Sequence, residues 1–149
     1  MTQSKGTALI TGASTGIGAI YADRLAKRGH DLIIVARNRQ RLASLARRLA
    51  GETGRKVEMV EADLTSPADL QRVEDILKTN AGISLLVNNA GVGATAPLAA
   101  SDVDKMEDMI SLNVTALTRL TYAAVPGFVS RGNGTITTLR RSSRSRLRC

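Results

Sequence analysis

Short apolar runs rich in β-branched residues and leucine alternate along the chain with longer segments whose apolar residues recur at helical spacing. Such alternation is typical of consecutive β-α-β units, which form a parallel sheet. The run from Leu32 to Val35 is continuously apolar, as a strand covered on both faces requires. The sequence therefore predicts an α/β fold built on a parallel sheet, with strands expected over residues 7–11, 31–36, 56–61, 83–87 and 135–139.

The intervals between these strands are predicted to be helical. In residues 16–28, the apolar side chains that share one helical face are Ile17, Ile20, Tyr21 and Leu25. The next helix would bury Leu42, Leu45 and Leu49. A third helix is expected to begin at Ser66 and Pro67, a capping hydroxyl followed by a residue suited to the first turn. Residues 102–131 are expected to be largely helical, with a kink or an end at Pro126.

Length and composition narrow the class of protein further. A chain of 149 residues suits one domain, and contents of 43% hydrophobic and 23% charged residues exclude disordered and collagen-like chains. No apolar run approaches the ~20 residues of a membrane-spanning helix, and no signal-peptide core precedes the first strand. We therefore expect no membrane association and a cytoplasmic location. The lone His30 and the lone Cys149 offer no metal-ligand spacing, so no metal site is expected.

A glycine-rich segment from Thr11 to Gly18 joins the first predicted strand to the first predicted helix. A dinucleotide-binding fold receives the cofactor's pyrophosphate at this place. Gly12 permits a sharp turn, Gly16 lets the backbone approach a phosphate closely, and Gly18 lets the helix pack on the strand. Free N–H groups at the helix start would then face the anion. The alternative is a glycine-rich turn that binds no ligand.

Four short motifs follow one another along the chain. The spacing Thr-Gly-x-x-x-Gly-x-Gly over residues 11–18, with Asn-Asn-Ala-Gly over residues 88–91, resembles the short-chain dehydrogenase/reductase family. Ala-Asp-Leu at residues 62–64 and Ser-Leu-Asn-Val at residues 111–114 are similar to two further motifs of that family. Thr15 stands where the extended branch of the family has another glycine, so the chain resembles the shorter, single-domain branch.

The resemblance implies a Rossmann-type, doubly wound parallel sheet, here incomplete with about five strands, and an NAD(P)-binding domain over residues 1–136. It also implies an oxidoreductase that transfers hydride between NADP(H) and a small-molecule alcohol or carbonyl substrate. Complete members of the family commonly form homo-oligomers. We do not expect this shorter chain to form them.

The resemblance also assigns residues to parts of the cofactor. They are Gly12, Ser14, Gly16, Ile17 and Gly18 at the phosphates, Asp63 and Leu64 near the adenine, and Asn89, Ala90 and Gly91 along the ribose. Asn113 matches one member of the family's catalytic set. Two alternatives stay open: Asp63 could instead start the following helix, and Asn89 and Asn113 could satisfy buried backbone groups.

The residue after the second strand indicates which cofactor is bound. An NAD-binding fold places a carboxylate about 20 residues beyond the glycines, whereas a cation there favours a 2'-phosphate. Arg37 lies 19 residues after Gly18, and its guanidinium suits a phosphate in a forked geometry. NADP(H) is therefore expected rather than NAD(H). Arg39 or Arg41 could take the place of Arg37, or Arg37 could be a solvated strand-end residue.

The family's proton-transfer pair is absent from the sequence. Family members use a serine, a tyrosine and a lysine four residues after the tyrosine, whose charge lowers the pKa of the phenol. Here Tyr21 is followed four positions later by Leu25, and Tyr122 by Pro126. No Tyr-x-x-x-Lys segment occurs in the 149 residues, so we expect the chain to be inactive.

The composition changes abruptly after Ile136. Family strands at this place run apolar to the catalytic serine, whereas here a stretch rich in Thr, Arg and Ser follows. Residues 136–141 can be written with the codons ATC ACA ACA TTG CGT CGT, and restoring one T to this choice of codons gives ATC ATC AAC ATT GCG TCG, which would encode Ile-Ile-Asn-Ile-Ala-Ser. We hypothesise a frameshift near Thr137, which leaves residues 137–149 out of frame and disordered and truncates the chain before the catalytic tyrosine.

The basic charge of the chain lies mainly in its last ten residues. Residues 140–149 contain five arginines and no acid, and without them the net charge falls from +8 to +3. Such a segment can contact nucleic-acid phosphates, but it has no aromatic residue for stacking, so no specific nucleic-acid partner is expected. The alternatives to an oxidoreductase are thus a non-catalytic dinucleotide-binding protein and, less favoured, a weak nucleic-acid binder with a basic tail.

Overall fold

The computed structural model of the chain describes residues 4–93 and 97–139. The predictions that concern the arginine-rich segment 140–149 and Cys149 lie outside the described residues.

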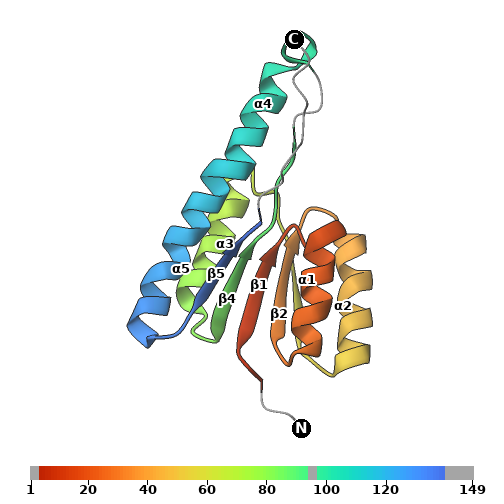
Figure 1. The fold of residues 1–149 in the computed structure, drawn as a ribbon, viewed down its shortest axis with the longest axis vertical. Helices are drawn as coiled ribbons and strands as arrows, with labels where there is room; N and C mark the ends of the chain where they lie inside the picture. Colours follow the sequence, from red (N-terminus) through yellow and green to blue (C-terminus); the bar gives the residue numbers. More distant parts are fainter. Residues whose placement is uncertain (1–3, 94–96, 140–149) are drawn as a thin grey trace.

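A five-stranded parallel sheet forms the centre of the molecule (Figure 1). Its strands are β1 (Thr7–Thr11), β2 (Asp31–Ala36), β3 (Val57–Glu61), β4 (Ile83–Asn88) and β5 (Thr135–Thr138), in the spatial order β3-β2-β1-β4-β5. This arrangement confirms the predicted α/β fold with a doubly wound parallel sheet. Because all strands run in one direction, their carboxyl ends meet along the same edge of the sheet.

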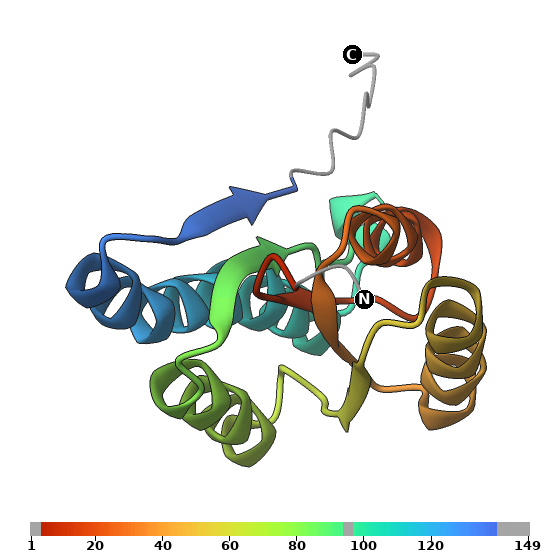
Figure 2. The same ribbon diagram turned by 90° about the horizontal axis from the view of Figure 1, so that it is seen from below.

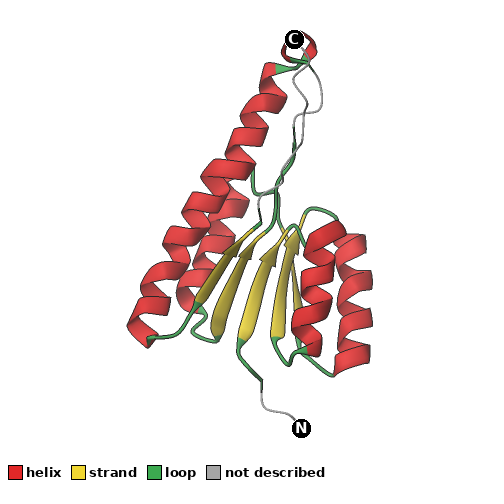
Figure 3. Ribbon diagram, viewed as in Figure 1, coloured by secondary structure: helices red, strands yellow, loops and turns green. Residues whose placement is uncertain are grey.

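Helices cover both faces of the sheet, which Figures 2 and 3 show as a strand layer between two helix layers. The elements are α1 (Gly16–Lys27), α2 (Arg39–Thr53), α3 (Pro67–Thr79), a short 3-10 turn (Leu98–Ala100), α4 (Val103–Ile110), a π-helical segment (Ser111–Ala116) and α5 (Leu117–Arg131). One buried apolar cluster lies between the sheet and α1 and α2, and another between the sheet and α3 and α5. None of the described helices combines the length and apolarity needed to cross a membrane.

The buried face of α1 differs from the predicted one. Ile17 and Ile20 are 53% and 52% exposed, and Tyr21 is only partly buried. The buried side of the helix instead carries mostly small residues, namely Gly18, Ala22, Leu25 and Ala26. Small side chains let the helix axis lie close to β1 and β2, and they turn Ile17 toward the carboxyl edge of the sheet.

Of the two outcomes predicted for Pro126, a kink or an end of the helix, the end does not occur, because α5 continues through this residue to Arg131. Proline removes one backbone donor, which would otherwise bond to the carbonyl of Tyr122. Both Pro126 and Tyr122 are exposed, so water can satisfy that carbonyl and the helix can continue. The preceding π-helical segment, which the sequence did not predict, carries Asn113.

The last strand, β5, begins at Thr135 as predicted and extends to Thr138. It pairs with β4 through four residue pairs, among them Val87 with Thr137 and Asn88 with Thr138. Two residues that the frameshift hypothesis assigns to the out-of-frame segment therefore lie in a strand.

Candidate functional site

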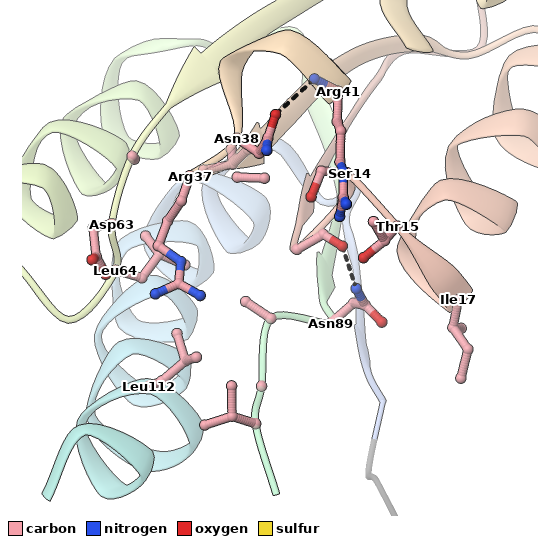
Figure 4. Close-up of a pocket in the computed structure, with 17 residues that line it drawn as sticks. Ser14, Thr15, Ile17, Arg37, Asn38, Arg41, Asp63, Leu64, Asn89 and Leu112 are labelled. Carbon is pink, nitrogen blue, oxygen red and sulfur yellow. Dashed lines mark hydrogen bonds between the residues drawn. The ribbon is translucent and has the colours of Figure 1, made fainter. Parts of the chain in front are cut away.

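A cleft of 550 Å³ lies at the carboxyl edge of the sheet. Its walls come from the end of β2 and the loops that follow β1, β2, β3 and β4, together with the starts of α1 and α2 and Leu112 (Figure 4). In this sheet the winding direction reverses beside β1, and ligands of doubly wound folds bind at such a reversal. The structure brings together nine of the predicted site residues here: Gly12, Ser14, Ile17, Arg37, Asp63, Leu64, Asn89, Ala90 and Gly91.

The glycines of the first loop serve different purposes. Gly12 and Gly16 have φ values of 65° and 56°, a left-handed conformation that side-chain-bearing residues rarely adopt. A Cβ atom added to Gly16 would meet nothing within 4 Å, whereas one added to Gly18 would lie 2.3 Å from the carbonyl oxygen of Gly12. Gly16 thus permits the turn and leaves open space beside it, and Gly18 permits close packing of α1 on the loop.

The amino end of α1 has the properties of an anion site. Thr15, which precedes the helix, makes no side-chain capping hydrogen bond, and the first turn contains no acidic residue. In α2, by contrast, the Asn38 side chain caps the N–H of Arg41 at 2.9 Å. The first N–H groups of a helix have no partner within the helix, and they carry its positive dipole end. At α1 they stay available to an anion in the cleft.

Hydrogen bonds fix the loop after β4 to the glycine loop. The buried Thr11 hydroxyl accepts from the backbone N–H groups of Asn89 at 3.1 Å and Ala90 at 3.0 Å, and it donates to the carbonyl of Val87 at 3.4 Å. The Asn89 side-chain amide donates to the carbonyls of Thr11 and Gly12, both at 3.0 Å. Figure 4 draws the second of these bonds. Asn89 therefore satisfies backbone groups and also lines the cleft, so the two interpretations of this residue are compatible.

Asn113 lies outside the lining of this cleft. Its side-chain oxygen accepts from the N–H of Val92 at 3.0 Å, and its amide donates to the carbonyl of Val92 at 2.7 Å. The π-helical segment is thereby tied to the loop that follows β4. This geometry agrees with the alternative that Asn113 satisfies backbone groups, and its place in a catalytic set stays a prediction.

Asp63 combines the two roles considered for it. Its carboxylate accepts from the backbone N–H and the hydroxyl of Thr65 at 3.0 Å and 2.7 Å, which forms the turn before α3. It also lines the cleft. Burial raises the pKa of the Asp63 carboxyl, but the hydrogen bonds from Thr65 and the positive charge of Arg37 outweigh it and hold the pKa below its usual value.

The lowered pKa of Asp63 predicts a pH-dependent loss of stability. A carboxyl whose pKa is lower in the folded state stabilises the fold above the unfolded pKa of about 3.9, and the stabilisation is lost as the pH falls through the folded pKa. We expect Asp63→Asn to lower the free energy of unfolding at about pH 7, and to lower it much less at about pH 3. Urea unfolding of both proteins at the two pH values measures this. An equal difference at both would contradict the assignment.

Three arginines near the end of β2 occupy different surroundings. Arg37 and Arg41 line the cleft, and Figure 4 shows their side chains on two sides of its opening. Arg39 does not line it; its guanidinium lies 3.8 Å from the carboxylate of Glu61.

The sequence profile described as short chain dehydrogenase matches residues 6–143 of the chain. The chain belongs to the short-chain dehydrogenase family. It is 34% identical over 138 residues to a very-long-chain 3-oxoacyl-CoA reductase of Pyrenophora tritici-repentis, covering 89% of this chain and 40% of that protein. It is 32% identical over 135 residues to the human inactive hydroxysteroid dehydrogenase-like protein 1, covering 89% of this chain and 41% of that protein.

Solved structures of this family share the fold. A short-chain dehydrogenase from Sphingobium yanoikuyae, solved in complex with NADPH, is 51% identical with a TM-score of 0.88 over 89% of this chain and 52% of that chain. The chain thus spans about half the length of this dehydrogenase. It spans a smaller share, 40% and 41%, of the two related proteins named above. The family and its Rossmann-type fold, predicted from the motifs, are confirmed.

Proposed function

We propose that this chain is the dinucleotide-binding part of a short-chain dehydrogenase and that it binds NADP(H) in the cleft at the carboxyl edge of the sheet. The observation that carries the proposal is the uncapped amino end of α1, which opens on this cleft beside the glycine turn. The NADPH complex of the Sphingobium dehydrogenase supports the choice of ligand. Arg37, rather than a carboxylate, at the end of β2 supports NADP(H) over NAD(H).

The residues of the cleft fit such a dinucleotide by their chemistry. The first turn of α1 would bind the pyrophosphate, and the loop of Asn89, Ala90 and Gly91 would lie along the ribose. Asp63 and Leu64 would flank the adenine. In the family the nicotinamide, when bound, would give hydride to a carbonyl substrate in its reduced form or accept hydride from an alcohol in its oxidised form, and the protein would orient it for either direction.

We further propose that the chain of 149 residues binds the cofactor without reducing a substrate. It contains no Tyr-x-x-x-Lys segment, so the acid that gives a proton to the carbonyl oxygen is missing. The similarity to a human protein described as an inactive hydroxysteroid dehydrogenase-like protein supports a non-catalytic binder as the second candidate.

A paired binding and activity assay separates these possibilities. The purified chain is titrated with NADPH, and NADPH oxidation is then followed with a panel of aldehydes and ketones. Binding without oxidation is the expected result. Oxidation above that of a protein-free control would contradict the non-catalytic proposal, and failure to bind would contradict the cofactor proposal.

We propose, third, that residues 137–149 are translated out of frame. One observation on the fold supports this. The side-chain oxygen of Asn88 is buried without a hydrogen-bond partner among the described residues, and its amide donates to the hydroxyl of Thr121 at 3.2 Å. Thr138 is paired with Asn88 across the parallel ladder. The restored frame places an asparagine at 138, whose amide could donate to that oxygen across the strands.

The frame proposal has a protein-level test. Because Thr138→Asn adds a donor beside the unpaired oxygen, we expect it to raise the free energy of unfolding by about 0.5–1.5 kcal/mol. The matched control is Thr135→Asn, on the same strand and also exposed, but paired with Leu85, where no gain is expected. If neither substitution raises the free energy of unfolding, this support for the frameshift is lost. Sequencing the gene tests the frameshift itself, which is refuted if the shifted downstream frame encodes no Tyr-x-x-x-Lys segment.

A further inference from the structure

We propose that Glu74 of α3 is a positioning residue for the cleft at the carboxyl edge of the sheet. Through its ion pair with Arg119 of α5, Glu74 holds the π-helical segment in the register in which Asn113 binds Val92. This role rests on the proposed function, because the residues that are held in place line the cleft assigned to NADP(H).

Glu74 is the only buried residue with an ionisable side chain in the part of the chain that the structure describes. Its side chain is 6% exposed, and both carboxylate oxygens have a cationic partner. Arg119 Nε donates to Oε1, and Lys78 Nζ lies 3.5 Å from Oε2. Arg119 also donates to the side-chain oxygen of Gln71 at 3.3 Å. Because Lys78 and Gln71 belong to α3 with Glu74, Arg119 is the partner that joins the two helices.

Stability alone does not explain a carboxylate at this position. The other buried residues of α3 and α5 are apolar and belong to one cluster. Removing a carboxylate from water costs free energy that an ion pair only partly returns, and a well-packed apolar side chain at such a place is often equally stable. The ion pair supplies instead a directional bond, which fixes how α5 lies on α3 in a way that apolar contacts do not.

The position of Arg119 in the chain connects this bond to the π-helical segment Ser111–Ala116. Arg119 is the third residue of α5, which begins where that segment ends. A π-helical turn holds one residue more than an α-helical turn. If the segment reverted to regular α-helix, the residues on its two sides would rotate by about 100° relative to each other. Asn113 could then no longer bind Val92 while Arg119 binds Glu74, so the two polar contacts together hold the extra residue in place.

The register of this segment decides where two residues of the cleft lie. Leu112 belongs to the π-helical segment and Val92 to the loop that follows β4, and both line the cleft (Figure 4). A change of register would turn Leu112 away and release Val92 from Asn113. Glu74 does not line the cleft, but through Arg119 it holds the helix that carries one wall and ties down the other.

The test measures hydrogen exchange of the Val92 amide, calorimetric NADPH binding and urea unfolding on the full chain and its variants. The Val92 N–H donates to the Asn113 side chain, so its exchange reports this bond directly. We expect Glu74→Met to raise the exchange rate about 10-fold and to weaken NADPH binding about 3-fold or more. The free energy of unfolding should stay the same or rise, because methionine buries no charge and the half-exposed Arg119 remains hydrated.

Three further variants calibrate the result. Asn113→Ala removes the bond to Val92 itself and should give the largest increase in exchange. Glu74→Gln keeps a side-chain oxygen as acceptor for Arg119 and should retain most of the Val92 protection. Lys78→Met is the matched control, because Lys78 contacts the same carboxylate from within α3, and it should leave Val92 exchange and NADPH binding unchanged.

Unchanged Val92 exchange in a folded Glu74→Met protein would overturn the positioning role of Glu74, and so would an equal increase in Lys78→Met. A Glu74→Met protein that is much less stable, or that does not fold, would also overturn it, because the ion pair would then serve stability. Faster exchange with unchanged NADPH affinity would refute the link to the cleft. If the unsubstituted chain binds no NADPH, the proposed function is refuted, whereas Val92 exchange still decides whether Glu74 holds this loop.

Discussion

Replacing Gly18 by alanine should abolish NADPH binding and lower the free energy of unfolding by about 1–3 kcal/mol. The added Cβ would lie 2.3 Å from the carbonyl oxygen of Gly12 and 2.4 Å from the side-chain nitrogen of Asn89. The first contact is with backbone, so α1 itself must move away from the glycine loop. This movement would displace the first-turn N–H groups that we assign to the pyrophosphate.

The matched control for Gly18→Ala is Gly51→Ala. Gly51 lies inside α2, and a Cβ added there would meet nothing within 4 Å. Alanine at such a helical position should stabilise the fold by about 0.5–1 kcal/mol and leave NADPH binding unchanged. Urea unfolding and NADPH titration measure both effects. Normal binding by a folded Gly18→Ala protein would contradict the assigned packing of α1.

Replacing Thr11 by valine should lower the free energy of unfolding by about 2–4 kcal/mol, because two backbone N–H groups lose their acceptor. These N–H groups belong to Asn89 and Ala90, and both bond to the Thr11 hydroxyl. Valine has nearly the same volume, so the loss reports on hydrogen bonding rather than on a cavity. The loop after β4, which contains Asn89 and Ala90 and lines the cleft, should also become more mobile.

Thr11→Ser is the control for this second prediction, because serine keeps the hydroxyl and removes only a methyl group. We expect it to retain NADPH binding, with a smaller loss of stability than Thr11→Val. Hydrogen exchange of the Asn89 and Ala90 amides gives the most local measurement, and both amides should exchange faster in Thr11→Val. Unchanged exchange would mean that the Thr11 hydroxyl does not hold this loop.

The sheet could be predicted closely because its signal is local. The bounds of β1 and β2 match the predicted residues 7–11 and 31–36, since a doubly covered strand needs a continuous apolar run. The face of α1 could not be predicted in this way. Its periodicity favours Ile17 and Ile20, but the tight packing of Gly18 and Ala22 against the sheet decides which side is buried.

The candidate site was predictable where the residues themselves carry the signal. Glycines between a strand and a helix indicate a phosphate loop, and nine predicted residues do line one cleft. Thr11 was missed as a site residue because its partners lie 76–79 positions away, and only the paired strands bring them together. Its signal, a hydroxyl at the end of an apolar strand, is too common to stand alone.

The arginines near β2 illustrate the same limit. The sequence favoured Arg37 at the 2'-phosphate and left Arg39 and Arg41 as alternatives within the same short segment. The N-cap at Asn38 sets the direction of α2, and this direction brings Arg41 to the cleft and Arg39 toward Glu61. Side-chain direction at a helix start depends on this geometry, which residue type does not encode.

The central claim is that the first turn of α1 binds the paired phosphates of a nicotinamide dinucleotide. Calorimetric titration of the folded, monodisperse chain with NADPH tests it most directly. The account predicts saturable binding at one site, tighter for NADPH than for NADH and lost in Gly18→Ala. A folded chain that binds neither dinucleotide at about millimolar concentration would contradict it.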